Sequence, residues 1–125
     1  MAKKVIISCA VTGAIHTPSM SEFLPVTAEE VIEHSLAAHE AGAAVLHLHA
    51  RDENDGHPTQ DPEEFQKFLP TIHNSCDAVI NITTGGGPQM TVEERMKPAM
   101  HFKPELASLN LSLIHISEPT RRPII

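Results

Sequence analysis

Aromatic residues and cysteines are scarce in this chain of 125 residues, and long hydrophobic runs are missing from it. It contains no tryptophan and no tyrosine, so a folded core must consist mainly of aliphatic side chains. Cys9 and Cys76 are too few for a disulfide framework, which favours free thiols in a reducing compartment. No apolar run approaches the roughly 18 residues that cross a membrane. The short run after Lys4 also lacks the cleavage-type ending of a signal peptide. We therefore expect a cytoplasmic protein that does not bind a membrane.

Positive charge is also scarce. Nine Lys and Arg residues stand against 16 Asp and Glu residues, which gives a formal net charge of −7 at pH 7. Phosphate neutralisation needs clustered Lys and Arg, so nucleic acid is not an expected partner. The hydrophobic fraction of 41% and the length predict one globular domain.

Apolar runs of strand length alternate with helical patterns along the chain. Strands are predicted at residues 5–11, 43–49, 78–83 and 106–111, and the first two runs are typical of strands buried on both faces. Helices are predicted between them, opened by Thr27 with Glu30, by Asp61 with Pro62, and by Thr91 with Glu94. Gly42 should end the first helix, and Pro98 should make the third one short.

The spacing of the strands predicts parallel βα units with right-handed crossovers, and hence an α/β fold. Such units close either as a doubly wound sheet or as a (βα)8 barrel. Four strands would make the N-terminal half of a barrel, truncated after about the fourth strand. The loop at residues 12–25 is longer than most βα connections, which favours a functional role.

Residues 111–121 break this pattern. Their eleven codons can be written, without forcing, as the transposase-end adapter used in sequencing libraries. We therefore expect residues 1–110 to be native barrel sequence and residues 111–125 to be a read-through tail, so that His115 is not a metal ligand. The alternative is a genuine, unusual C-terminus.

His47 and His49 are alternate residues at the end of the second predicted strand. Residues two apart on a strand point to the same side, about 7 Å apart along the strand, which is a workable bite for one tetrahedral metal ion. The alternative is a pair of core histidines bonded to carbonyl groups. A catalytic zinc site needs a third protein ligand, commonly a carboxylate, and the first, third and fourth strands offer no Asp or Glu.

Two further features lie where strands end. Arg51 could bind a substrate carboxylate or hold a neighbouring acidic side chain, and the alternative is a surface salt bridge. Thr83 leads into Gly85, Gly86 and Gly87, whose backbone could approach an anion closely, although a plain tight turn fits equally well. His16, in the long loop, has a smaller claim to line a site, and Cys9 is expected to be a small buried apolar residue.

Several motifs together resemble the β-keto acid cleavage enzyme family, which includes the 3-keto-5-aminohexanoate cleavage enzyme. They are Ala-Val-Thr-Gly-Ala at 10–14, Ala-Gly-Ala at 41–43, His-Leu-His-Ala-Arg-Asp at 47–52, Ile-Thr-Thr-Gly-Gly at 82–86 and Lys-Pro-Glu-Leu-Ala-Ser-Leu-Asn at 103–110. The resemblance implies a full (βα)8 barrel of more than twice this length, and a homo-oligomer.

The resemblance also implies a zinc-dependent acyl transfer, in which a β-keto acid and acetyl-CoA give acetoacetate and a new acyl-CoA. His47 and His49 match the family's zinc ligands, and Thr83 and Ser108 match hydroxyl positions near the substrate. Arg51 matches a residue at the edge of the site, without an assigned role. The third ligand and the general base are expected beyond this chain, so no catalytic residue is predicted within it, and the chain alone should be inactive.

The sequence departs from the family pattern at one position, and two alternative functions stay open. Ile15 stands where the aminohexanoate enzyme often has an acidic residue, which puts a substrate ammonium group in doubt. Another zinc-dependent barrel hydrolase is the main rival, although hydrolases of the amidohydrolase type carry their His-x-His motif on the first strand. A non-catalytic fragment is the other.

Overall fold

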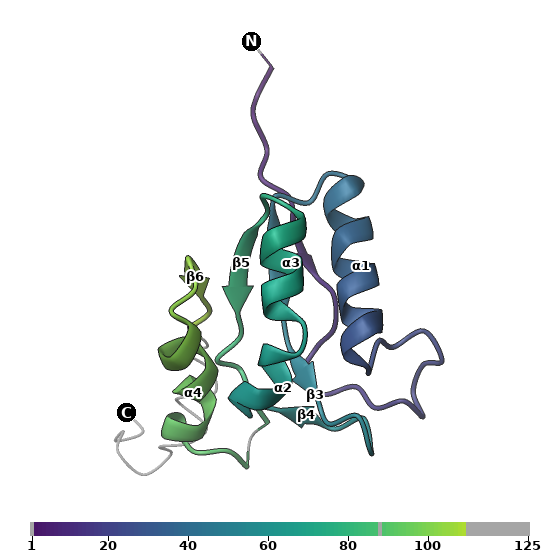
Figure 1. The fold of residues 1–125 in the computed structure, drawn as a ribbon, viewed down its shortest axis with the longest axis vertical. Coiled ribbons are helices and arrows are strands. Elements are labelled where there is room, and N and C mark those ends of the chain that lie inside the picture. Colours follow the sequence, from purple (N-terminus) through teal and green to yellow (C-terminus); the bar gives the residue numbers. More distant parts are fainter. Residues whose placement is uncertain (1, 88, 110–125) are drawn as a thin grey trace, which may run out of the picture.

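A computed structural model describes residues 2–87 and 89–109 and shows an α/β fold, as predicted (Figure 1). Four parallel strands form one sheet in the order β1-β2-β5-β6. These strands are β1 (Ser8–Ala10), β2 (Val45–Leu48), β5 (Val79–Ile82) and β6 (Leu106–Ala107). Each strand pairs with the previous one in this sheet along the chain. A doubly wound sheet reverses direction at a switch point, whereas barrel strands follow in sequence, so this order favours the barrel alternative.

Helices follow three of these strands. They are α1 (Ala28–Glu40), α2 (Pro62–Gln66), α3 (Leu69–Ser75) and α4 (Val92–Phe102), and a short antiparallel hairpin of β3 (Ala50–Arg51) and β4 (Pro58–Thr59) precedes α2. Both predicted capping boxes are present: Thr27 accepts from the Glu30 main-chain N–H, and Thr91 accepts from that of Glu94. Gly42 follows α1 with a φ of 115°, a conformation that favours glycine.

The core lies between the sheet and the helices. Leu46 and Leu48 of β2 are fully buried, and Ile82 of β5 is 1% exposed. The side chains packed in the same core from the helices and from the turn between α2 and α3 are Val31, Phe65, Phe68, Leu69 and Ile72. Each such side chain contributes roughly 1.5–3 kcal/mol when fully buried. The side chains at alternate positions of β2 and β5, including Val45 and Val79, are only partly buried. The sheet therefore has one closed face and one more open face.

The N-terminal half of the first predicted strand is not buried. Val5, Ile6 and Ile7 are 79%, 77% and 53% exposed, and β1 begins only at Ser8. Ile7 still accepts hydrogen bonds from Ala44 and Val45 through its carbonyl group. The prediction of burial on both faces was therefore wrong here, because β1 is an edge strand with one neighbour in the described sheet.

Proline positions account for two further differences. The helix predicted from Asp61 is split into α2 and α3, and Pro70 lies in the first turn of α3, where its missing N–H costs nothing. The short helix predicted at Pro98 was wrong, since α4 runs through Pro98 to Phe102. The Pro98 side chain is fully buried there, and this packing offsets the lost helical hydrogen bond. The sequence reading also missed the β3–β4 hairpin, whose strands have two residues each.

Candidate functional site

All four strands of the sheet end at the same edge, because they are parallel. The paired positions define a row across the open face, in which Ala10, His47, Asn81 and Leu106 are aligned. Extending this register by two residues gives a second row at the strand ends, which consists of Thr12, His49, Thr83 and Ser108. Main-chain hydrogen bonds from Thr83 to Leu48 and from Ser108 to Ile82 show that the pairing continues that far between β2 and β5 and between β5 and β6. The fold therefore aligns the predicted histidines and hydroxyl residues.

The two histidine rings lie next to each other. Their centroids are 4.8 Å apart and the ring planes are nearly perpendicular. A zinc–nitrogen bond of about 2.0–2.1 Å places a ring centroid about 3 Å from the metal, so both rings could reach one ion. His49 is 8% exposed, and its Nδ1 has no hydrogen-bond partner among the described residues. An unpaired buried polar atom costs about 1–3 kcal/mol, which a ligand at this atom would recover.

Burial keeps both rings neutral near neutral pH. It lowers the pKa of His49 to about 4, and the nearby His47 and Arg51 contribute to this shift while the main chain of Thr12 opposes it. Burial also lowers the pKa of His47, with an opposing effect of Asn81. A neutral imidazole is the form that binds metal ions.

Thr83 and Ser108 each accept a main-chain N–H. The Thr83 hydroxyl accepts from Gly85 at 3.0 Å, and the Ser108 hydroxyl accepts from Thr84 at 2.9 Å. Thr84 donates its own hydroxyl to the carbonyl oxygen of Ser108. Accepting a main-chain proton orients each hydroxyl and leaves its own proton available to donate. These residues are therefore suited to donate hydrogen bonds to a substrate oxygen.

The glycine loop after β5 is closely packed. A Cβ atom on Gly86 would lie 2.5 Å from Sδ of Met90 and 3.1 Å from Cγ of Gln60. Gly86 and Gly87 are buried, and the Gly85 N–H is already bonded to Thr83. Close packing thus explains Gly86 without a ligand, and anion binding by this loop stays a prediction.

Among the described residues, Arg51 neither holds an acidic side chain nor forms a surface salt bridge. Its side chain is 2% exposed, and within residues 2–87 and 89–109 it forms no ion pair. It donates instead to Thr12 Oγ1 and to the main-chain carbonyls of Gly13, His16 and Gly56. Four hydrogen bonds leave one of its five N–H groups free. Direct substrate binding by Arg51 stays a prediction, and its contacts show that it holds loops together.

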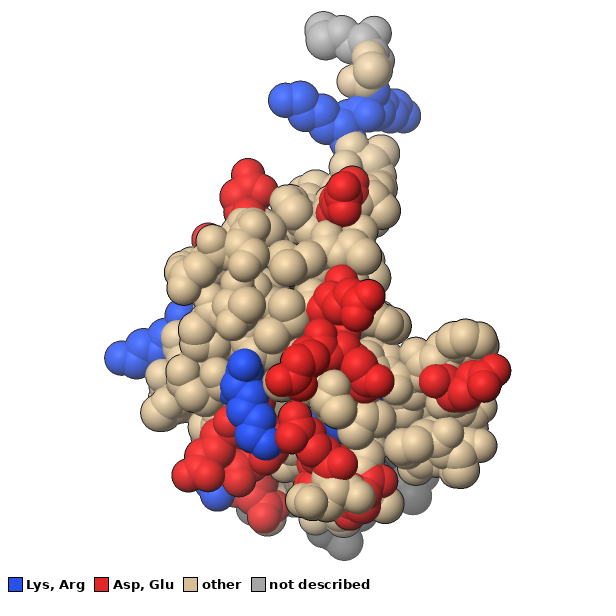
Figure 2. Space-filling model, turned by 45° about the vertical axis from the view of Figure 1, so that its right-hand side comes forward, with Lys and Arg blue, Asp and Glu red and all other residues tan. Residues whose placement is uncertain are grey.

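No third ligand completes the pair within the described ranges, where no group of three or more His, Cys, Asp or Glu residues could hold a metal ion. The acidic side chains gather instead in the lower half of the face seen in Figure 2. Independently of that view, acidic residues occupy the first turns of α1, α2 and α4, namely Glu29, Glu30, Glu63, Glu64, Glu93 and Glu94. There they interact favourably with the helix dipoles, and this accounts for them structurally.

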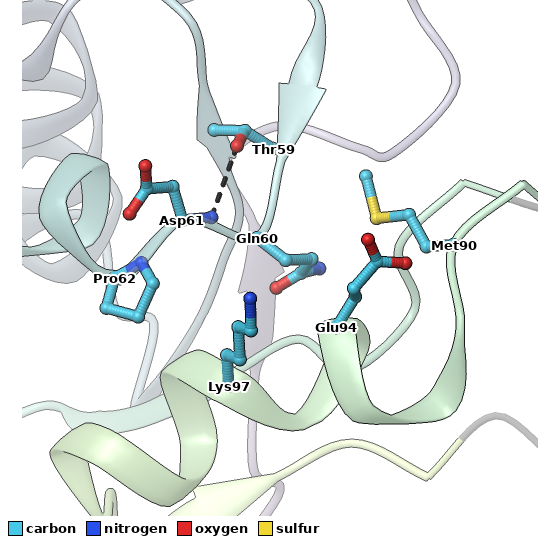
Figure 3. A pocket seen from close by; sticks show the side chains of 7 residues that line it. All are labelled: Thr59, Gln60, Asp61, Pro62, Met90, Glu94 and Lys97. Atoms are coloured by element: carbon cyan, nitrogen blue, oxygen red, sulfur yellow. Dashed lines mark hydrogen bonds between the residues drawn. The ribbon is translucent and has the colours of Figure 1, made fainter.

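A separate hollow of about 270 Å³ lies between the start of α2 and α4 (Figure 3). It is lined by Thr59, Gln60, Asp61, Pro62, Met90, Glu94 and Lys97, and neither histidine of the pair contributes to it. Glu94 is committed to the capping box of α4. The hollow therefore offers no second cluster of reactive groups.

Comparison with known proteins identifies the family. The sequence profile of the β-keto acid cleavage enzymes matches residues 4–122. The chain belongs to the β-keto acid cleavage enzyme family. It is 67% identical over 109 residues to the 3,5-dioxohexanoate:acetyl-CoA acetone transferase of Paraburkholderia graminis, covering 87% of this chain and 35% of that protein. It is 44% identical over 109 residues to the 3-keto-5-aminohexanoate cleavage enzyme of Acetoanaerobium sticklandii, covering 86% and 39%.

Another relative is the 3-dehydrocarnitine:acetyl-CoA trimethylamine transferase of Rhizobium meliloti, 33% identical over 94% of this chain and 40% of that protein. Among solved structures, the apo form of ObcA matches with a TM-score of 0.59 and 25% identity, over 71% of this chain and 23% of that chain. The chain thus spans well under half the length of the curated β-keto acid cleavage enzymes that it matches.

The other sequence predictions have mixed outcomes. His16, His34, His57, His73 and His101 are exposed and His39 is half-buried, so these histidines differ from the buried His49. The predicted tail at 111–125 lies outside the described residues, and the family profile runs on to residue 122. In the part of the chain that the structure describes, no helix has the length and apolar character needed to cross a membrane.

The sequence reading missed Asn81 and Thr12 as members of the site. Asn81 is aligned with His47, and its Oδ1 is buried without a partner in the described residues. Its sequence signal is a single amide within the apolar run of residues 78–82. Thr12 is 7% exposed and contacts both Arg51 and His49. Its sequence signal is its place in the Ala-Val-Thr-Gly-Ala motif at 10–14.

Proposed function

We propose that the protein containing this chain transfers acyl groups between a β-keto acid and acetyl-CoA. The keto acid is cleaved between its α- and β-carbons, and its acyl part goes to coenzyme A. The remaining two-carbon carboxylate part bonds to the acetyl group of acetyl-CoA and leaves as acetoacetate. Family membership supports this proposal, and so does the alignment of two histidines and two hydroxyl residues at the edge where parallel strands end. That edge is where barrel enzymes have their active sites.

We further propose that His47 and His49 bind Zn²⁺. The neighbouring rings, their neutral state and the unpaired Nδ1 of His49 fit a metal better than a pair of satisfied core histidines. A bound zinc ion would stabilise negative charge that develops on substrate oxygens. A third ligand and a general base would come from a part of the protein outside this chain, in a complete (βα)8 barrel that assembles as a homo-oligomer in the cytoplasm.

Thr83 and Ser108 would donate hydrogen bonds to the keto acid, since each hydroxyl is oriented by a main-chain N–H and keeps its own proton. Gly85 and Gly86 would shape the floor of the site beside Thr83. We propose no residue of this chain as the acid or base.

The substrate we propose has an uncharged group at its far end. Ile15 is 77% exposed in the loop between β1 and α1, and it cannot pair with an ammonium group. The name of the 67% identical relative contains 3,5-dioxohexanoate, a keto acid whose far end is a neutral ketone. We therefore propose that class, rather than 3-keto-5-aminohexanoate.

Zinc analysis of the full-length protein tests the metal site. We expect about one zinc per chain, lost or reduced at least tenfold in affinity in His47→Ala and His49→Ala, since each variant removes one of three protein ligands. His73→Ala is the matched control, because His73 is exposed on α3. Undiminished zinc in both site variants would defeat the metal proposal.

Activity needs its own test. The full-length protein, supplied with acetyl-CoA and a panel of β-keto acids, should produce acetoacetate and the matching acyl-CoA, measured by mass spectrometry. We expect neutral-ended keto acids to react faster than amino-substituted ones. Hydrolysis of the panel without acyl-CoA formation would favour the rival barrel hydrolase.

Re-sequencing the gene beyond the codon for Asn110 would decide whether residues 111–125 are native.

A further inference from the structure

Arg51 connects two segments that are far apart in the sequence. Its Nε donates to Thr12 Oγ1 at 3.0 Å and its Nη2 donates to the Gly13 carbonyl at 2.6 Å. Its Nη1 donates to the carbonyls of Gly56, at 2.7 Å, and of His16. The planar guanidinium thus contacts the loop after β1 on one side and the turn of the β3–β4 hairpin on the other. Lysine could not reproduce this arrangement, because it has no planar fork of donors.

The loop after β1, residues 11–27, has little else to hold it. Its two ends are anchored, because Val11 packs against the core and Pro25 is buried. Between them, the apolar residues Ile15, Met20 and Phe23 are 77%, 64% and 79% exposed. Its internal main-chain hydrogen bonds are two turns, from Met20 to Thr17 and from Leu24 to Ser21. A loop with few buried side chains opens at low free-energy cost unless residues of other segments bind it.

The hairpin turn at residues 52–57 makes two further contacts with this region. Gly56 lies against Pro18, so closely that a Cβ on Gly56 would be 2.3 Å from Cγ of Pro18. The Glu53 carboxylate accepts from the Ala28 N–H at 3.0 Å, at the start of α1. Arg51 and the Gly56–Pro18 contact therefore join the loop to the turn, and Arg51 and Gly56 are both buried. The Glu53 hydrogen bond joins the turn to the first residue of α1.

The fastened end of the loop borders the metal-binding pair. Thr12 contacts Arg51 through its side chain and His49 through its main chain. It also shares the second row with His49, by extension of the pairing of Ala10 with His47. Any movement of Gly13 to His16 would change the wall of the site next to that ring.

We propose that Arg51 is a positioning residue: by binding residues 12–16 to the hairpin turn, it shapes the part of the site that receives the β-keto acid. This inference rests on the function proposed above and assigns Arg51 a role that does not involve touching the substrate. We call the four hydrogen bonds of the Arg51 side chain the clamp. Loss of the clamp should weaken keto acid binding while zinc stays in place, because β2 and not the loop positions His47 and His49.

Two variants of the full-length zinc-loaded protein test the clamp. Arg51→Lys keeps the charge and loses the fork, and Thr12→Val removes one acceptor without touching Arg51. We expect the KM for the keto acid to rise on the order of tenfold in Arg51→Lys and severalfold in Thr12→Val, with kcat and zinc content within about twofold of wild type. The double variant should be no worse than Arg51→Lys alone, because both changes break the same contact.

A second measurement does not depend on activity. Protease Glu-C cuts after Glu22, which lies exposed in the loop, and we expect cleavage there to be faster in both variants than in the wild type. Lys97→Met, which removes an exposed cation on α4, is the control and should change neither KM nor cleavage. Wild-type KM and cleavage rate in Thr12→Val would overturn the proposal, even if Arg51→Lys fails to fold. A KM increase in Arg51→Lys alone, with unchanged cleavage, would instead assign Arg51 to direct substrate binding. Loss of zinc from wild type would count against the proposed function, not against the clamp.

Discussion

Gly56 shows how a single residue fixes the hairpin turn against the loop after β1. Its φ is 74°, which L side chains rarely adopt, and the space for a Cβ is filled by Pro18. Gly42 has a φ of 115° but no atom within 4 Å of a Cβ position. An alanine substitution at Gly42 would therefore add backbone strain alone, whereas one at Gly56 would add both backbone strain and steric overlap.

We predict that Gly56→Ala destabilises the protein by about 2–4 kcal/mol and Gly42→Ala by about 1 kcal/mol, since only the first adds an overlap to the strain. Thermal unfolding of the full-length variants measures the difference. Pro18→Ala should recover part of the Gly56→Ala loss, because it removes the atoms that the new Cβ meets. Equal losses in the two glycine variants would show that the contact with Pro18 is dispensable.

At the scale of elements, the capping boxes decide where α1 and α4 begin. The Glu30 carboxylate accepts from the N–H groups of Val26 and Thr27, at 2.8 and 3.0 Å. These bonds, that of Val26 foremost, hold the pKa of Glu30 below its usual 4.5. Thr91 and Glu94 make the equivalent arrangement at α4. Such caps are short-range, so the sequence predicts them directly.

We predict that Thr27→Ala and Thr91→Ala each cost about 1 kcal/mol of stability. Glu30→Gln should also lower the melting temperature at pH 7. A carboxyl group with a lowered pKa in the folded state stabilises above its unfolded pKa and loses that contribution as the pH falls through the folded value. The difference in melting temperature between wild type and Glu30→Gln should therefore decrease from pH 6 to pH 3. A difference that does not change with pH would contradict this prediction. Glu33→Gln, exposed on the same helix, is the control.

At the scale of the whole molecule, the sheet has one closed and one more open face. Leu46 and Leu48 are buried against the helices, while Val45 and His47 on the same strand are partly exposed. The exposed apolar residues include Leu106 in β6, and Val5, Ile6 and Leu109 in the segments that flank β1 and β6. A sheet closed into a barrel would cover its inner face and pair its edge strands.

We predict that the 125-residue chain alone forms no detectable acetoacetate from acetyl-CoA and a β-keto acid, under conditions where the full-length protein does. It should also bind a hydrophobic dye more strongly per residue, because its apolar surface is uncovered. Measurable acyl transfer by the chain would mean that its two histidines suffice, and would remove the need for ligands from elsewhere.

The sequence alone determined the alternation of strands and capped helices, the α/β class and the candidate residues His47, His49, Thr83 and Ser108. The elements and the histidine pair follow from periodicity, caps and strand ends, which depend on neighbours within a few residues. Thr83 and Ser108 as substrate-binding residues follow from the resemblance of their motifs to the family. The tertiary structure decided the rest. Whether α4 continues through Pro98 depends on burial of that side chain. The partners of Arg51 lie 35 and more residues away in the loop after β1, so only the return of the chain beside β2 brings them within reach. The alignment of Asn81 with His47 likewise depends on strand register, which no local pattern specifies.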